Sequence, residues 1–411
     1  MKPILKVVQK RISPPIQPLL ALQAVAMAAV VKANKPHLNL QIKCAETSAH
    51  FTKKTNNNNS PSMTTTKEHL YHYTTQEGLL GILENNSLWA THYKFLSDYS
   101  EMSLFKNKLI EFVEHDALKS LKKVYSEASK KIISADKEIA ALNEDEKHDL
   151  AEDAAEFYYK EKTHVLINEL YNHIEQFCEI YITSFCESHF SKDQDQHNNG
   201  LLKQWLVYGK EGGYAIEFNK NSLKKLIIEE KKRFNYKIFC NDVHYSGDEE
   251  YYKEYFANDL DNIKCFVKER MQQKTIGTTL TQPILDALIR CTMFYKDERF
   301  IEEKEFKIIA LPEIKLFSFL RFDFLKNRSQ YNKPRKFRER NGELIPYIEL
   351  FDCHKKNDKT KKINPPLPIQ KIIVGPHKDK EARAIWLKIQ LASMGRSDIK
   401  VAVSQIPFVE Y

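Results

Sequence analysis

The sequence lacks the cysteine spacing of a zinc knuckle or a disulfide scaffold. Its seven cysteines are scattered over 411 residues, and no two of them form a CxxC pair. An odd number of unpatterned cysteines is typical of a reducing compartment, so we expect a cytoplasmic protein. The sequence also lacks an HExxH motif, and its histidines are too dispersed to form a ligand set. We therefore expect no metal site.

Most of the chain also lacks net charge. The formal charge is +8, but residues 1–62 hold nine Lys or Arg side chains against one acid and so account for all of it. The remaining 349 residues carry 54 basic and 54 acidic side chains. A neutral body has no global field to attract phosphates, which argues against broad nucleic-acid binding as the main function.

A hydrophobic run long enough to span a bilayer is missing as well. The apolar stretch 19–31 is too short for a comfortable crossing, so we expect no membrane partner. The basic residues before this stretch are similar to those of a targeting leader, whereas Met63 follows a polar low-complexity segment and looks like a natural start. We interpret residues 1–62 as a disordered basic leader, either an upstream extension or a targeting segment. Residues 63–411 are then a single domain.

The hydrophobic pattern of this domain predicts an α+β fold with a mixed, mainly antiparallel sheet. Helical spacing over 100–177 indicates a helical hairpin inserted into the sheet core. A strand at 372–374, a helix that ends at Gly395 and a strand at 400–403 predict a C-terminal βαβ unit. Further strands are predicted at 70–73, 88–91, 180–185, 214–218, 236–245, 306–311 and 344–351, and further helices at 221–229, 248–272 and 280–296.

The segment Tyr71-His72-Tyr73-Thr74 is the first candidate for a functional site. It alternates like a strand, and Thr74 with Glu77 forms a capping box for the next helix. A histidine held rigidly at a sheet edge can donate or accept a hydrogen bond to a ligand. The same spacing fits a core histidine beside a helix cap, so both interpretations stay open. The pair Asp98 and Glu101 predicts a second capping box.

The segment 204–216 is the second candidate. Its glycines precede a strand and permit the close approach of a ligand, while Trp205 and Tyr208 have rings that can stack on a planar group. The spacing is not that of a GxGxxG phosphate-binding loop. A turn flanked by core aromatics explains the same residues.

Charged residues provide two further candidates. Glu303 and Glu305 lie two apart at the start of a strand, so both side chains are expected on one face, as a reaction through an oxocarbenium-like centre requires. A solvated charged edge is the alternative. The basic run 335–340 contains one aromatic residue and is interpreted as a surface loop rather than a nucleic-acid site.

Taken in order over residues 70–408, these motifs resemble a widespread bacterial domain of unknown function. That domain is distantly similar to the ADP-ribosyltransferase fold, in which a strand-borne histidine, an aromatic clamp and a late glutamate surround NAD. The resemblance implies that His72 binds the ribose hydroxyls, that Tyr208 or Trp205 stacks on the nicotinamide ring, and that Glu305 stabilises positive charge. It implies further that Glu303 positions the acceptor and that Tyr73 and Gly209 lie beside the bound NAD.

The expected function is therefore that of an NAD-consuming ADP-ribosyltransferase or NAD glycohydrolase, acting as a bacterial toxin or defence effector. Its acceptor is a protein or a nucleic acid. One alternative is a non-catalytic interaction module that binds a protein partner through the helices of 100–177. The other is a nucleic-acid-acting protein that uses residues 335–340.

Overall fold

The computed structural model describes residues 69–96, 102–114, 143–187, 199–209, 212–234, 236–272, 281–312, 333–352 and 366–407. Within these ranges the chain forms two compact units. The helical unit comprises the described parts of Lys106–Asn172 and Asn258–Ala287, and the sheet unit comprises those of Asn59–Phe105, His173–Ala257 and Leu288–Tyr411. The predicted leader 1–62 and the predicted capping box of Asp98 and Glu101 lie outside the described residues.

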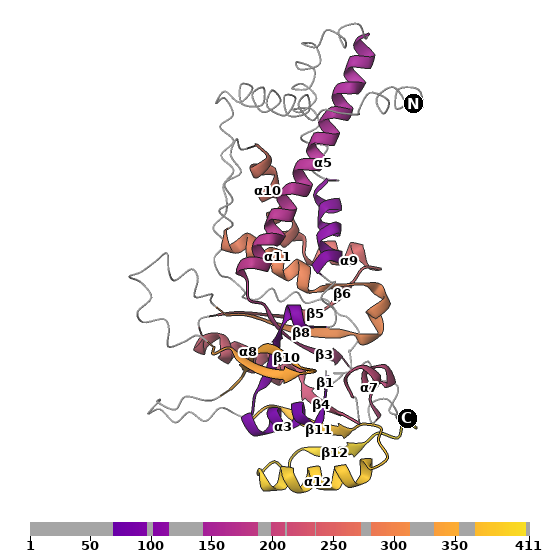
Figure 1. Ribbon diagram of the computed structural model, residues 1–411, viewed down its shortest axis with the longest axis vertical. Coiled ribbons are helices and arrows are strands. Elements are labelled where there is room, and N and C mark those ends of the chain that lie inside the picture. The colour runs from indigo at the N-terminus through magenta and orange to yellow at the C-terminus, as the bar shows by residue number, and fades with distance from the viewer. Residues whose placement is uncertain are drawn as a thin grey trace, which may run out of the picture. The chain divides into compact units, whose positions relative to one another are not determined.

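The helical unit contains most of α5 (Glu144–Phe177) and α10 (Ala257–Gln272), together with part of a helix over 102–114 and the start of α11 (Gln282–Met293) (Figure 1). Its interior is formed by apolar side chains of α5 such as Leu166 and Leu170, which are buried. Two hydrogen bonds tie neighbouring helices together. The Tyr159 hydroxyl donates to the Val113 carbonyl at 3.3 Å, and Lys162 Nζ donates to the Met271 carbonyl at 2.7 Å.

The sheet unit is built on a ten-stranded sheet with the order β12-β11-β4-β1-β3-β2-β10-β9, and β8 joins β3 to β5. Among the described strands of this sheet, β11 and β12 pair in parallel and the other neighbours are antiparallel. This confirms the predicted mixed, mainly antiparallel sheet. The strands are β1 (His69–Thr74), β2 (Leu88–His92), β3 (Tyr181–Glu187), β4 (Tyr214–Asn219), β5 (Lys237–Asp242), β8 (Glu305–Leu311), β9 (Lys336–Arg340), β10 (Glu343–Leu350), β11 (Ile369–Val374) and β12 (Lys400–Val403), with a separate pair β6 (His244–Tyr245) and β7 (Tyr295–Lys296).

Strand β3 is the point at which the sheet branches. Along one edge it pairs with β8 from Tyr181 to Cys186. Along its other edge, Tyr181 and Ile182 pair with β2, whereas Cys186 and Glu187 pair with β1. Among the described strands, none pairs with residues 183–185 on that second edge. The strands β1 and β2 therefore separate from each other along β3, and the backbone between them is open to side chains.

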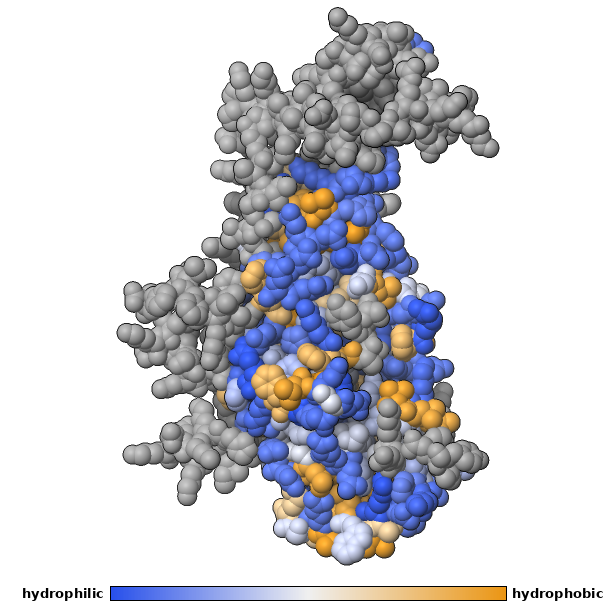
Figure 2. All heavy atoms as spheres, viewed as in Figure 1, coloured by the Kyte–Doolittle hydropathy of each residue, from blue (hydrophilic) through white to orange (hydrophobic). Residues whose placement is uncertain are grey.

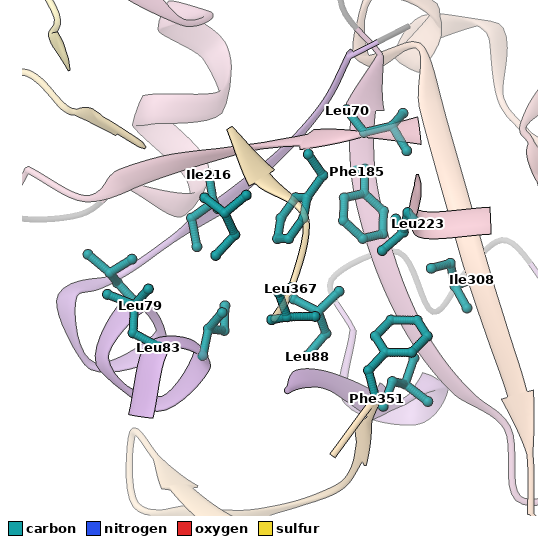
Figure 3. Packing of buried hydrophobic residues seen from close by; sticks show 14 of the residues in the cluster. Leu70, Leu79, Leu83, Leu88, Phe185, Ile216, Leu223, Ile308, Phe351 and Leu367 are labelled. Atoms are coloured by element: carbon teal, nitrogen blue, oxygen red, sulfur yellow. The ribbon is translucent and has the colours of Figure 1, made fainter. Parts of the chain in front are cut away.

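The main hydrophobic core lies between the sheet and the helices α3 (Gln76–Asn85), α8 (Lys220–Arg233) and α12 (Lys380–Ser393). Figure 3 shows Leu79 and Leu83, one turn apart on α3, pointing into the same apolar space as Ile216. The rings of Phe185 and Phe218 meet edge to face at 5.7 Å. Burying such large apolar groups is the main favourable term in folding, so this core fixes the positions of β1, β3 and β4.

Three local predictions were wrong. The helix α3 is capped by Thr75, whose hydroxyl accepts from the Gly78 amide at 3.2 Å, because Thr74 is still paired within β1. The predicted helix 248–272 is two helices, α9 (Glu249–Tyr255) and α10, which are separated at Phe256. The predicted loop 335–340 contains β9, which a turn with φ of 55° at Asn341 and 80° at Gly342 joins to β10.

Helix α12 covers β11 and β12 at one edge of the sheet (Figure 1). Its inner face buries Ala384, Leu387 and Leu391. Ile385 and Trp386 of the same helix are exposed, and hydrophobic surface appears over this end of the unit in Figure 2. None of the described helices has the length and hydropathy needed to cross a membrane.

Candidate functional site

A cavity of about 880 Å³ lies in the sheet unit where β1 and β2 separate along β3. Its size is that of a pocket for a small molecule or nucleotide. Of the seven residues that the family resemblance places at NAD, five line this cavity and two, Trp205 and Gly209, do not. The five are His72, Tyr73, Tyr208, Glu303 and Glu305, and they are joined by Ser184, Thr91, Trp89 and Arg338.

His72 occupies the open edge of β3. Its Nδ1 lies 2.9 Å from the carbonyl oxygen of Ser184, in the stretch that no described strand pairs on that side. Because a carbonyl oxygen only accepts, Nδ1 carries the proton and donates it. Burial lowers the pKa of His72, so the ring is neutral at pH 7 and its Nε2 presents a lone pair. The His72 side chain thus makes the hydrogen bond to β3 that a neighbouring strand would otherwise make. Its Nε2 can still accept a hydrogen bond from a ligand.

Glu305 is the first residue of β8 and is buried. Its Oε2 lies 3.1 Å from Lys296 Nζ and 3.5 Å from Lys307 Nζ. The hydroxyl of Ser184 donates a further hydrogen bond to the carboxylate. Burial alone would raise the pKa of Glu305, but the two ammonium groups and the hydrogen bonds outweigh it and hold the pKa below its ordinary value. The carboxylate is therefore ionised at neutral pH.

Glu303 does not lie on the strand with Glu305, contrary to the expectation that they share a strand face. It is the last residue of the 3-10 helix η3 (Glu298–Glu303), and Lys304 between them has a φ of 42°. Lys296 brings the two acids together, because its Nζ contacts Glu303 Oε2 at 2.7 Å as well as Glu305. The two acids are thus held together by the buried ammonium group of Lys296, and not by lying on the same face of a strand.

Sequence reasoning did not single out Ser184, although it contacts both His72 and Glu305. Its carbonyl accepts from the histidine, and its hydroxyl donates to the carboxylate. A detectable signal was the pair Thr183-Ser184, two hydroxyl residues in an otherwise apolar stretch of β3. The hydroxyl oxygen of Thr183 is buried in the cavity wall with no hydrogen-bond partner among the described residues. Polar groups of this kind in a core strand are typical of a functional site.

The two aromatic candidates differ in their surroundings. Trp205, on the helix α7 (Leu202–Tyr208), is 2% exposed, and its Nε1 donates to the Asn199 carbonyl at 2.9 Å. Its ring packs edge to face on Tyr73 at 4.9 Å, and Gly209 and Gly375 lie against it so closely that a Cβ atom would not fit. Trp205 is therefore a core residue. Tyr208 is 39% exposed and lines the cavity.

Tyr73 and Gly209 have structural partners in the same region. The Tyr73 hydroxyl accepts from the Leu201 amide at 2.9 Å, although part of its ring still lines the cavity. Gly209 caps α7, with its amide bonded to the Trp205 carbonyl at 2.9 Å. These contacts hold α7 against β1, so that Tyr208 stands at the cavity wall.

Strand β9 places two arginines at another part of the cavity, where uncharged side chains of β2 also line the wall. The guanidinium carbon of Arg338 lies 4.8 Å from the centre of the Trp89 ring, and its Nη2 donates to Thr91 Oγ1 at 2.9 Å. Arg340 also lines the cavity. Within the part of the chain that the structure describes, no group of three or more His, Cys, Asp or Glu residues is placed to hold a metal ion.

A comparison with protein families gives one match. Residues 204–308 match a family model described as a protein of unknown function (DUF2971). The matched segment runs from α7 to β8, so it contains Tyr208, Glu303 and Glu305 but not His72. This confirms the expected resemblance to a domain of unknown function for that segment. No curated protein and no solved structure matches the chain.

Proposed function

We propose that the protein consumes NAD, as an ADP-ribosyltransferase or an NAD glycohydrolase. The observation that carries this proposal is the double contact of Ser184, which joins a neutral His72 to an ionised Glu305 at one cavity. Cleavage of NAD needs acceptors for the ribose hydroxyls and a negative charge close to the anomeric carbon. His72 provides the acceptor for a ribose hydroxyl, and Glu305 provides the negative charge.

The proposed reaction breaks the bond between the anomeric carbon of the ribose and the ring nitrogen of nicotinamide. The bonding electron pair leaves with nicotinamide, and positive charge develops on the ribose. A fixed carboxylate such as Glu305 stabilises that charge without reorganising. Water or an acceptor oxygen then forms the new bond to the anomeric carbon and releases its proton. This is the charge pattern of glycoside cleavage.

The other residues of the cavity have roles that fit this reaction. Nε2 of His72 accepts a hydrogen bond from a ribose hydroxyl, because Nδ1 is already committed to Ser184. The ring of Tyr208 is partly exposed at the cavity and offers a stacking surface for nicotinamide. Lys296 holds Glu303 beside Glu305, where Glu303 orients the acceptor. Consumption of NAD would deplete a cell of this cofactor, which is the basis for proposing a toxin or defence role.

Release of nicotinamide by the purified full-length chain tests the proposal. We expect release from NAD by the unmodified protein and a loss of at least a hundredfold in Glu305→Gln and His72→Ala. Glu302→Gln is the matched control, because Glu302 belongs to the same η3 segment but its side chain is 76% exposed and pairs only weakly with Lys203, at 3.5 Å. No release by the folded protein, or release unchanged in Glu305→Gln, would refute an NAD-cleaving function.

A further inference from the structure

The cavity has two chemically different ends, and both lie along β3, so their separation can be taken from positions on that strand. Glu305 pairs with Cys186 near one end of the strand, and Thr91 pairs with Ile182 near the other. These positions are four residues apart, which corresponds to about 13 Å along an extended strand. His72 contacts Ser184, halfway between them. A ligand that reaches both ends would therefore place its middle at His72.

The Thr91 end is a rigid platform for one guanidinium group. Trp89 and Thr91 are two residues apart, so both lie on the same face of β2. Tyr347 of β10 pairs directly with Thr91. The guanidinium carbon of Arg338 lies 4.8 Å from the Trp89 ring centre and 5.7 Å from that of Tyr347. Stacking on two rings and the bond to Thr91 fix its orientation before any ligand arrives.

Glu77 acts on the charge of this guanidinium group, but only from beyond ion-pair distance. Among the described residues, no carboxylate lies within ion-pair distance of Arg338 or Arg340, although Glu77, Glu339 and Glu343 also line the cavity. The Nε of Arg338 is buried and has no hydrogen-bond partner among the described residues. A buried N–H group without an acceptor is costly and rare, so an unmet donor in a cavity wall points to a ligand acceptor.

We infer that Arg338, with Arg340 beside it, forms a subsite for a phosphoryl group of the ligand. Nε and a terminal nitrogen of a guanidinium form a planar fork that matches two oxygens of a phosphate. The ligand class is a nucleotide whose phosphate binds at Arg338 while its sugar lies at His72. This inference deepens the proposed function by naming the group that the cavity recognises at its second end, and it does not require that NAD be cleaved.

Binding of ADP and adenosine to the full-length protein, measured by calorimetry, tests the subsite. Hydrogen bonds between charged groups change affinity by about ten- to a hundredfold, so ADP is expected to bind more tightly than adenosine by that factor. In Arg338→Gln the affinity for ADP should fall towards that for adenosine, while the affinity for adenosine stays unchanged. Lys388→Gln removes one charge from the exposed surface of α12 and should change neither affinity.

A second variant keeps the test decisive if Arg338→Gln fails to fold. Arg338→Lys retains the charge but lacks the fork, so it should lose at least fivefold in ADP affinity with the same midpoint of thermal unfolding. Equal binding of ADP and adenosine by the unmodified protein would overturn the inference, as would unchanged ADP affinity in the folded variants. Because ADP has no nicotinamide, its binding is independent of the nicotinamide release that tests the proposed function.

Discussion

The carbonyl oxygen of Ser184 accepts a hydrogen bond from Nδ1 of His72 at 2.9 Å, although the two residues are 112 positions apart. The contact exists because β1 and β2 leave the same edge of β3 at different points, so that none of the described strands pairs with the backbone of residues 183–185 on that side. A side chain satisfies a backbone acceptor there.

Removing the Ser184 hydroxyl breaks the contact of Ser184 with Glu305 and keeps its contact with His72. In Ser184→Ala the carbonyl still holds His72, but Glu305 loses one donor. We expect kcat for nicotinamide release to fall about tenfold, with KM little changed, because the hydroxyl acts on the carboxylate rather than on the ligand. Steady-state kinetics measure both constants. Ser393→Ala, which removes an exposed hydroxyl from α12, is the control, and an unchanged kcat in Ser184→Ala would contradict a positioning role.

The buried cation between the two acids, Lys296, should contribute strongly to the free energy of unfolding. Lys296 is 1% exposed and contacts both Glu303 and Glu305, so Lys296→Met removes this cation from both acids and leaves Glu305 with its longer, 3.5 Å contact to Lys307. We expect the free energy of unfolding to fall by about 3–5 kcal/mol, measured by urea denaturation at pH 7. Lys203→Met removes a lysine whose ion pair with Glu302 is exposed, and it should cost less than about 0.5 kcal/mol.

The same pair of acids provides a stricter version of that experiment. Adding Glu305→Gln to Lys296→Met removes one of the two carboxylates that lost this cation, so the double variant should be more stable than the sum of the two single changes predicts. A strictly additive result would show that the ammonium group and the carboxylate of Glu305 do not interact in solution.

Trp205 and Tyr208 should have opposite phenotypes. Trp205 is buried against Tyr73, so Trp205→Ala is expected to reduce the free energy of unfolding by about 3–5 kcal/mol, while the milder Trp205→Phe folds and keeps its KM for NAD. Tyr208 is exposed at the cavity. Tyr208→Ala should change stability by less than about 1 kcal/mol and raise KM about tenfold. A raised KM in Trp205→Phe would assign the stacking role to the other ring.

His92, the last residue of β2, should make stability depend on pH. Burial is the main reason that its pKa is lowered to about 4, with the charge of Glu179 opposing this shift and that of Lys94 adding to it. The unfolded chain, with a pKa of about 6.5, then binds more protons, so this stabilisation is complete above pH 6.5 and is lost as the pH falls towards 4. His92→Phe keeps the ring contacts but cannot titrate. Between pH 7 and 4 the unmodified protein should lose on the order of 2 kcal/mol more than this variant.

Those free energies come from denaturant titrations of both proteins at several pH values. The comparison cancels the carboxylates that titrate in the same range, because both proteins contain them. Parallel pH profiles for the two proteins would mean that His92 has a similar pKa in the folded and unfolded chains.

The sequence by itself determined which segments form the sheet and where His72 lies in it. Apolar alternation located β1, β4 and β12 to within two residues, since one face of each strand must be buried against a core. It also placed Glu305 at the start of a strand. These features depend on neighbours a few positions away, so they can be read from local pattern. The charged strand β9 was missed because its side chains alternate without an apolar face.

Only the tertiary structure decided which of the candidates meet. The branch of β3, the bridge of Lys296 between two acids and the choice of Tyr208 over Trp205 all depend on segments far apart in the chain. Hydrophobic periodicity records whether a side chain is buried, but it does not record which strand lies beside it or which charge it faces. The cavity, with His72 between Glu305 and Arg338, results from that long-range pairing.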